Sequence, residues 1–269
     1  MADLAGKVAI VTGSTQGLGA AIARLFAERG ASGLVTCGRS SDKGQKIASE
    51  ITAEFGCPVH FVQADLAKIE DCRKVVKMAD EQFGRIDVLV NAAAITDRGT
   101  ILDTSPELFD SIIATNLRAP FFLMQDVAAI MRRERIEGSI VNIVSMSSMA
   151  GQSFVAAYCA SKGGLATLTK NTAYGLLPDR IRVNGLNIGW MASDGEDVMQ
   201  KTYHGATDGW LEKAAAEQPF GRLIEPAEVA RAVAFLAGPE SGLMTGSMVN
   251  FDQSVWGAYD APPQPGSAL

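Results

Sequence analysis

The sequence predicts an α/β fold, in which a single doubly wound domain has a seven-stranded parallel sheet with helices on both faces. Short apolar runs recur along the chain without alternating polar residues, as expected for strands that are buried on both faces. Helical patterns separate most of these runs, which favours parallel strands joined by crossover helices. The seven expected strands are KVAIVT (7–12), GLVTC (33–37), PVHFVQ (58–63), IDVLVN (86–91), SIVNIVS (139–145), IRVNGLN (181–187) and SMVNF (247–251).

Local signals mark the helices between these strands. After the first strand, GAAIARLFAERG (19–30) has a helical pattern and ends at Gly30, a residue type that commonly terminates helices. The Ser-Pro-Glu sequence at 105–107 combines a capping residue, a proline for the first helical position and an acid. Long helices are therefore expected over 105–132 and 155–177.

One catalytic domain is expected over residues 1–255, because no linker or internal repeat divides the chain. Segment 189–220 follows the sixth strand, and its length without strong structure predicts a functional flap over the carboxyl ends of the strands. An amphipathic lid helix with solvated acids is the alternative. Residues 256–269 include a Pro-rich stretch and are expected to form an extended tail.

Composition limits the classes of function. The chain has 269 residues, 47% of them apolar, which is enough for one large core, and its formal net charge of −6 argues against nucleic acid as a partner. No apolar run reaches the roughly 18 residues of a membrane span, and the N-terminus lacks a signal-peptide pattern. Four cysteines without C-x-x-C spacing and two histidines predict a cytoplasmic protein with reduced thiols and no metal site.

The first expected strand runs into a glycine-rich segment, TGSTQGLG (12–19). Gly13, Gly17 and Gly19 allow a sharp turn and a close approach to a phosphate, and the following helix points free N–H groups at that anion. An ordinary glycine-rich turn is the alternative. The position after the first strand of a parallel sheet favours a nucleotide-binding loop.

The sequence YCASK (158–162) places a phenol four residues before an amine. Residues at this spacing share one face of a helix, so Tyr158 and Lys162 are expected to point in one direction. In isolation, such a pair more often reflects packing than chemistry, because short motifs match by chance.

Five segments together resemble the short-chain dehydrogenase/reductase family. TGSTQGLG, LVNAAAI, IATNL, GSIVNIVS and YCASK occur in the order and spacing of that family, and the similarity extends over residues 5–252. The resemblance implies a Rossmann-type fold and hydride transfer between a nicotinamide cofactor and a CH–OH group. It also implies four catalytic residues, which are Asn116, Ser145, Tyr158 and Lys162.

The resemblance gives each of these residues a role. Tyr158 would move the proton on the substrate oxygen, although a phenol with a pKa of about 10 is a poor base at neutral pH. A neighbouring ammonium is expected to lower that pKa, and Lys162 would supply it while holding the nicotinamide ribose. Ser145 would hydrogen-bond the substrate oxygen. Asn116 would help to hold a water that links Lys162 to solvent, which completes a proton relay.

Pro120 predicts an unusual backbone at Asn116. In a regular helix the N–H of residue 120 donates to the carbonyl of residue 116, but proline has no N–H. The Asn116 carbonyl is therefore expected to lack an ordinary helical hydrogen bond and to be available to the water of the relay.

The second expected strand bears on the choice of cofactor. An acid at its end would hold the 2′-hydroxyl of NAD, whereas this chain has Gly38 followed by Arg39, and a guanidinium suits the 2′-phosphate of NADP. NADP is therefore favoured. NAD remains the alternative, because a solvated Arg39 fits the same pattern and Gln16 stands where many NADP enzymes of the family have a basic residue.

The resemblance implies the remaining cofactor contacts, with Asp65 expected to bond the adenine. The expected cofactor-binding residues are Gly13, Thr15, Gln16, Gly17, Leu18, Gly19, Arg39, Ser40, Asp65, Leu66, Asn91, Ala92, Ala93, Tyr158, Lys162, Ile188, Gly189 and Met191. The chain departs from the family at Ala94, where a glycine is usual. A methyl group at that position is tolerable only if φ is not positive.

The substrate side of the site is expected to include Ser145, Gln152, Tyr158 and Trp190. Acids and tryptophans in the flap favour a sugar or polyol, whereas nearby Met and Phe residues leave a ketoacyl-type or apolar carbonyl substrate open. A non-catalytic nucleotide-binding sensor is the alternative from another class. The resemblance implies a homotetramer that pairs through the two long helices.

Overall fold

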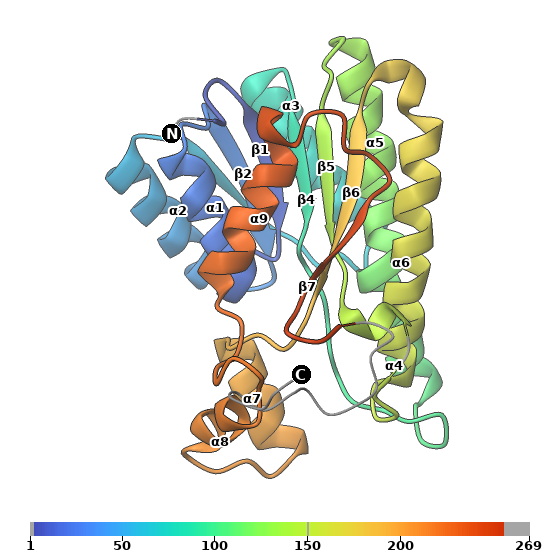
Figure 1. Ribbon diagram of the computed structural model, residues 1–269. Helices are drawn as coiled ribbons and strands as arrows, with labels where there is room; N and C mark the ends of the chain where they lie inside the picture. The colour runs from blue at the N-terminus through green and yellow to red at the C-terminus, as the bar shows by residue number, and fades with distance from the viewer. Residues whose placement is uncertain (1–2, 150, 256–269) are drawn as a thin grey trace, which may run out of the picture.

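The sheet is the centre of the molecule. The computed structural model describes residues 3–149 and 151–255, so the expected tail at 256–269 lies outside the described residues. Seven parallel strands lie in the order β3-β2-β1-β4-β5-β6-β7 (Figure 1). The strands are β1 Val8–Thr12, β2 Gly33–Gly38, β3 Val59–Gln63, β4 Val88–Asn91, β5 Ser139–Ile143, β6 Arg182–Ile188 and β7 Met248–Phe251. The predicted fold class and all seven predicted strands are confirmed.

Helices cover both faces of this sheet. They are α1 Gly17–Glu28, α2 Ser41–Phe55, α3 Ile69–Phe83, α4 Pro106–Ile113, α5 Ala119–Arg133, α6 Ala156–Gly175, α7 Asp194–Tyr203, α8 Trp210–Ala216 and α9 Pro226–Ala237. None of the helices in the described ranges is long and apolar enough to cross a membrane.

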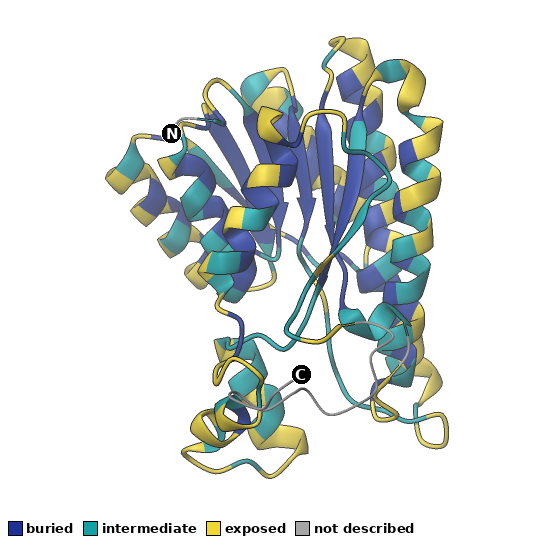
Figure 2. Ribbon diagram, in the orientation of Figure 1, coloured by how far each residue is buried: buried dark blue, intermediate teal, exposed yellow. Residues whose placement is uncertain are grey.

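Strand side chains sort into two apolar cores. Ala9 and Val11 of β1 belong to the core that α1 and α9 cover, whereas Ile10 between them belongs to the core that α3 and α5 cover. Successive side chains of a strand point to opposite faces, so a strand with two covered faces is apolar throughout. Figure 2 shows buried strands beneath helices whose outer surfaces are exposed.

The long helix expected over 105–132 is interrupted. Its start is as expected, because the Ser105 Oγ accepts a hydrogen bond from the Leu108 N–H at 3.2 Å and Pro106 is the first helical residue. A π-helical turn, Ala114–Arg118, then separates α4 from α5. Pro120 cannot donate into the regular ladder of a helix, which explains why the backbone widens here.

The flap expected over 189–220 contains α7 and α8, as the alternative of a lid helix predicts. Ser193 caps α7: its Oγ accepts from the Glu196 N–H at 3.2 Å. Acidic residues in the first turn stabilise the helix N-terminus further. The Ser-x-x-Glu sequence at 193–196 is the signal that identifies this helix. The flap is therefore a structured lid.

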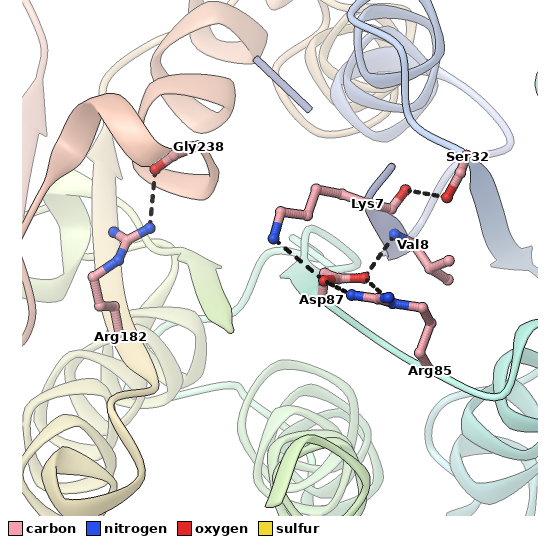
Figure 3. Close-up of polar contacts among 7 residues, drawn as sticks. All are labelled: Lys7, Val8, Ser32, Arg85, Asp87, Arg182 and Gly238. Atoms are coloured by element: carbon pink, nitrogen blue, oxygen red, sulfur yellow. Dashed lines mark hydrogen bonds and ion pairs between the residues drawn. The ribbon is translucent and has the colours of Figure 1, made fainter. Parts of the chain in front are cut away.

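A buried carboxylate joins the amino ends of the central strands. Asp87 has a side chain only 1% exposed, and it accepts hydrogen bonds from Arg85 Nε at 2.9 Å, Arg85 Nη2 at 2.7 Å and the Val8 N–H at 3.0 Å (Figure 3). Lys7 Nζ lies 3.4 Å from the same carboxylate. Burial raises the pKa of Asp87, but these donors and the charge of Lys7 outweigh it, so the pKa is lowered from its ordinary value.

Asp87→Asn is expected to lower the free energy of unfolding by about 2–3 kcal/mol at pH 7, because an amide loses the charge-assisted bonds to Arg85. Chemical denaturation measures this difference. Asp80→Asn, which breaks an exposed pair with Arg133, is the control and is expected to cost less than about 1 kcal/mol. A group with a lowered folded-state pKa stabilises above its unfolded pKa, so the effect of Asp87→Asn should shrink as the pH falls below about 4. A loss no greater than that of the control would contradict the prediction.

Candidate active site

The residues expected in the site gather at the carboxyl ends of the strands. β1 ends at the glycine-rich loop, β2 at Arg39, β5 at Ser145 and β6 at Ile188. The strand order reverses between β1 and β4, and ligands of such sheets bind in the crevice outside that reversal. This edge of the sheet is therefore the candidate site.

Close packing shapes the glycine-rich loop. A Cβ atom on Gly13, whose φ is 70°, would lie 2.8 Å from the Ala93 Cα, so only glycine fits there. Gly17 also has a positive φ, of 53°, and Gln16 precedes the first turn of α1 with Leu18 and Gly19 buried within it. The loop thus has the sharp turn and helix N-terminus of a phosphate cradle.

Thr12 connects the two loops that flank the crevice. Its Oγ1 accepts hydrogen bonds from the N–H groups of Ala92 and Ala93, each at 3.0 Å, and donates to the Val90 carbonyl at 3.3 Å. Sequence reasoning missed this residue, because a threonine at the end of a buried strand has no distinctive pattern. Thr12 fixes the spacing between the loops after β1 and β4.

The end of β2 explains the missing acid. A Cβ atom on Gly38 would lie 2.5 Å from the Thr15 Cγ2, so an aspartate at that position would require the Thr15 side chain to move. Arg39 and Ser40 follow and are exposed, and the Arg39 carbonyl accepts from Gln63 Nε2 at 3.1 Å. The surface at the end of β2 therefore presents a guanidinium and a hydroxyl in place of a carboxylate.

The loops after β3 and β4 occupy the same edge. The Asp65 Oδ1 accepts from the Ala67 N–H at 3.1 Å, and the side chain of Leu66 is buried. Asn91 is buried, and its Nδ2 donates to the Asn142 Oδ1 at 2.8 Å, which directs the amide into the sheet. The Asn91 side chain is therefore held by the sheet, and its contact with a nucleotide remains a prediction, as do those of Asp65 and Leu66.

The backbone at Ala94 is ordinary. Outside glycine, the only positive φ values in residues 3–149 and 151–255 are those of Arg135 and Arg180. A methyl group at position 94 therefore causes no backbone strain. This departure from the family is compatible with its cofactor loop.

Ser145, Tyr158 and Lys162 lie together beside the end of β5. The Ser145 hydroxyl lies near enough to the Tyr158 phenol to lower its pKa, and the Lys162 Nζ lies 5.6 Å from the centre of the Tyr158 ring. The Ser145 Oγ also accepts from the Ser147 N–H at 3.1 Å. The spacing in YCASK thus has its expected result, with phenol and amine on one face of α6.

The pKa of Tyr158 differs from expectation. Burial raises it to about 12, which outweighs the hydrogen bond from Ser145 that lowers it. The expectation of a phenol made more acidic by Lys162 is therefore wrong for the chain by itself, because loss of water around the hydroxyl dominates. A phenol in this environment keeps its proton at neutral pH.

Lys162 is almost fully buried. It is 2% exposed and its Nζ donates to the Ile143 carbonyl at 2.8 Å. Burial lowers the pKa of Lys162 to about 8, because the charged form loses its hydration. The ammonium therefore titrates close to neutral pH rather than near the usual value for lysine.

Asn116 lies behind this pair in the π-helical turn. Its Oδ1 accepts from the Ile95 N–H at 2.9 Å, and its Nδ2 donates to the Ile95 carbonyl at 3.0 Å and the Ser161 Oγ at 3.2 Å. Ser161 in turn donates to the Tyr158 carbonyl at 2.7 Å. π-turns occur often at functional sites. A free Asn116 carbonyl that holds a water remains a prediction.

Trp190 begins the lid instead of standing free in the crevice. Its Nε1 donates to the Glu196 Oε1 at 3.0 Å, and its ring stacks on Trp210 with centroids 6.2 Å apart. Gly189 donates its N–H to the Phe251 carbonyl at 3.0 Å, and Met191 forms an isolated bridge with Ile224. Trp190 is thus held by the lid itself.

Gln152 is exposed in the loop between Ser145 and Tyr158, where its Oε1 accepts from the Ser147 Oγ at 3.0 Å. Sequence reasoning missed Arg98, in the loop after β4, which contacts both the lid and the loop containing Gln152. A single arginine in a loop has no pattern that distinguishes it from a solvated one. The role of Arg98 becomes visible only in the structure, where its side chain contacts the lid.

A nucleotide-binding sheet edge beside a Ser–Tyr–Lys cluster defines a nicotinamide-dependent oxidoreductase. Residues 13–254 match a family model described as Enoyl-(Acyl carrier protein) reductase. The chain is 32% identical to a 3-oxoacyl-[acyl-carrier-protein] reductase of Staphylococcus epidermidis over 93% of this chain and 99% of the relative. It is 31% identical to galactitol 2-dehydrogenase of Agrobacterium fabrum over 93% of this chain and 97% of the relative.

A solved structure has the same architecture. L-Sorbose reductase of Gluconobacter frateurii, complexed with NADPH and L-sorbose, superposes with a TM-score of 0.88 at 28% identity, over 95% of this chain and 98% of that one. This chain belongs to the short-chain dehydrogenase/reductase family, whose members use NAD(P) and act on CH–OH groups. The alternative of a non-catalytic sensor is not supported.

Proposed function

We propose that this protein is an NADP-dependent oxidoreductase that interconverts a ketone and a secondary alcohol in a small sugar or polyol. The observation that carries the proposal is the Tyr158 phenol, which lies beside Ser145 with the Nζ of the buried Lys162 5.6 Å from the centre of its ring, at the nucleotide-binding edge. The bound nicotinamide would supply or accept the hydride. The chain's own residues would position the substrate and move the proton.

The residues at the sheet edge fit a nicotinamide nucleotide. The cradle formed by Gly13 and Gly17 would receive the pyrophosphate, since side chains are excluded there. Arg39 and Ser40 would bind the 2′-phosphate of NADP, because a guanidinium suits a phosphate and Gly38 offers no acid for the ribose hydroxyl. Asp65 would face the adenine. Ile188, Gly189 and Met191 would meet the nicotinamide.

The proton step follows from the Ser145–Tyr158–Lys162 cluster. Ser145 would hydrogen-bond the substrate oxygen, and Tyr158 would donate its proton to that oxygen as the ketone is reduced. A phenol whose pKa is raised to about 12 is protonated at neutral pH, which suits it to act as the acid in reduction. The Lys162 ammonium would stabilise the phenolate that remains. Lys162 would then return a proton to the phenolate, and Asn116 would hold the water that replaces this proton on Lys162.

Ketone reduction is expected to have constant kcat/KM up to about pH 8 and to decline above it. The reason is that Lys162, with its pKa lowered to about 8, loses the proton that stabilises the phenolate. Initial rates with NADPH across the pH range measure this profile. A profile that stays flat to about pH 10 would contradict the assigned role of Lys162.

The lid favours a polar substrate. Trp190 and Trp210 form an aromatic wall, and Glu196 and Asp197 beside them accept hydrogen bonds from the two indoles. The names of two similar proteins, a galactitol dehydrogenase and an L-sorbose reductase, support a sugar or polyol. A ketoacyl reductase is the second candidate, because a 3-oxoacyl-[acyl-carrier-protein] reductase is also similar over nearly the whole chain.

A substrate panel tests this proposal. NADPH and NADH oxidation would be followed with ketoses, acetoacetyl-coenzyme A and simple apolar ketones, and the reverse reaction with polyols. A ketose or polyol is expected to have the highest kcat/KM, with NADPH the better cofactor. An apolar ketone preferred by about tenfold or more would exclude the polar substrate class.

Trp190→Ala is expected to lower kcat/KM for the preferred ketose by about tenfold or more, because it removes one side of the aromatic wall and the anchor of Glu196. Steady-state kinetics measure the loss. Trp210→Phe, which keeps an aromatic ring in the wall, is the control and should have a smaller effect. Unchanged ketose kinetics in Trp190→Ala would remove Trp190 from the substrate site.

A homotetramer in the cytoplasm completes the proposal. Phe109 of α4 and Phe121 of α5 each stay 45% exposed, as expected for helices that pair with another subunit. Cys37, Cys57 and Cys72 are buried free thiols, as suits a reducing compartment. Sedimentation at micromolar protein concentration is expected to give four copies of the chain.

A further inference from the structure

Arg98 connects three segments around the site. Its Nη1 donates to the Thr96 carbonyl at 2.7 Å, and its Nε donates to the His204 Nε2 at 3.2 Å at the end of α7. Its guanidinium carbon lies 5.5 Å from the centre of the Phe154 ring, in the loop between Ser145 and Tyr158. The loop after β4, the lid and the loop before α6 therefore meet at one side chain.

Glu196 is the partner of Arg98 on the lid. The Arg98 Nη2 lies 3.6 Å from the Glu196 Oε1, and the two side chains are only 13% and 18% exposed. The same oxygen accepts from Trp190 Nε1 at 3.0 Å and Gln200 Nε2 at 2.7 Å. A mostly desolvated ion pair with further hydrogen bonds is a stronger contact than an exposed one.

A second contact crosses the same boundary. The Tyr203 hydroxyl, near the end of α7, hydrogen-bonds the Asp97 Oδ1 at 2.9 Å. Neighbouring residues of the loop after β4 thus hold α7 at both Glu196 and Tyr203. At its other end, the lid begins beside the glycine-rich loop, where the Gln16 Nε2 lies 3.6 Å from the position of a Cβ atom on Gly195.

The Arg98–Glu196 pair lies close to the reacting end of the site. Both charges act on the Tyr158 phenol, where Arg98 lowers the pKa and Glu196 raises it, each less than burial does. These contacts hold α7 against the loop after β4, on the side of the site where Tyr158 lies. A substrate with a long tethered arm needs more open space there than a small one.

We propose that Arg98 is a specificity-determining residue that, through Glu196, holds α7 closed over the site and restricts the enzyme to small polar substrates. This inference rests on the proposed oxidoreductase function and adds to it the reason why a thioester-linked acyl chain is rejected. Arg98 acts through the lid and is a positioning residue. Releasing α7 is expected to admit the longer substrate at the expense of the smaller one.

The test combines two probes with a measurement of the lid. The ratio of kcat/KM for the preferred ketose to that for acetoacetyl-coenzyme A is measured with NADPH, and hydrogen exchange is measured over α7. Arg98→Ala and the conservative Glu196→Gln are each expected to raise exchange in α7 and lower the ratio by at least about tenfold. The double variant should lose little more than either single variant, since both break one contact.

Lys201→Ala is the matched control. It removes a positive charge from α7 and breaks a pair with Asp197 inside that helix, so exchange and the substrate ratio should stay within about twofold of wild type. Unchanged exchange in Arg98→Ala and Glu196→Gln, or raised exchange with an unchanged ratio, would overturn the proposal. A wild-type enzyme that reduces the thioester as well as the ketose would overturn it and leave the oxidoreductase function intact. Inactivity toward both probes with either cofactor would refute both.

Discussion

Tyr158→Phe is expected to lower kcat for ketone reduction by at least about a hundredfold while leaving NADPH affinity unchanged. The phenylalanine keeps the ring beside Lys162 but removes the hydroxyl next to Ser145, so no acid remains beside the substrate oxygen. Fluorescence titration with NADPH and single-turnover hydride transfer separate binding from chemistry. Loss of turnover without loss of binding is the expected pair of results.

Tyr174→Phe is the control for this substitution. Tyr174 lies on the same helix, α6, but its side chain is 78% exposed, so the same loss of a hydroxyl should leave kcat unchanged. Near-normal turnover in Tyr158→Phe would exclude the phenol as the proton donor. Equal losses in both variants would point to damage to α6 rather than to chemistry.

The fold was predictable because it depends on patterns that repeat. Strands such as β1 and β5 are buried along their whole length, and a short apolar run between helical patterns is typical of a strand covered on both faces. The spacing of Tyr158 and Lys162 was equally informative, since helix geometry alone places the two side chains on one face. These features depend on neighbours in sequence.

Features that depend on distant contacts were not predictable. Pro120 signals an irregular backbone at Asn116, but the hydrogen bonds between Asn116 and the Ile95 backbone appear only in the structure, and the pKa of Tyr158 depends on what buries its hydroxyl. Arg98 contacts Glu196 across 98 positions of sequence, a pairing that periodicity cannot reveal. The lid helix α7 was predictable in part. Its Ser193 cap is visible in sequence, but its contacts with the rest of the chain are not.

The second large effect is expected on the preference for NADPH over NADH. Arg39→Ala is expected to weaken NADPH binding by about tenfold to a hundredfold and to leave NADH binding unchanged, because only NADPH has a 2′-phosphate for the guanidinium to bind. Arg39 is exposed at the end of β2, so its removal should not unfold the chain. Dissociation constants for both cofactors, measured by fluorescence titration, give the comparison. Arg73→Ala, on the exposed surface of α3, is the control for a lost positive charge.

A triple variant tests the physical reason for the preference. Thr15→Ser removes the Cγ2 atom that lies 2.5 Å from the position of a Cβ atom on Gly38. The nearest remaining atom of residue 15 is then its Oγ, at the position of the Thr15 Oγ1, 3.2 Å from that Cβ. Combining it with Gly38→Asp and Arg39→Ala places an acid where it can accept from the 2′-hydroxyl of NADH. The variant is expected to bind NADH more tightly than NADPH. Two results together would contradict this explanation: Arg39→Ala weakens the binding of both cofactors equally, and the triple variant binds NADH no more tightly than wild type does. The end of β2 would then not distinguish the 2′-phosphate from the 2′-hydroxyl, and NAD would be favoured as the natural cofactor.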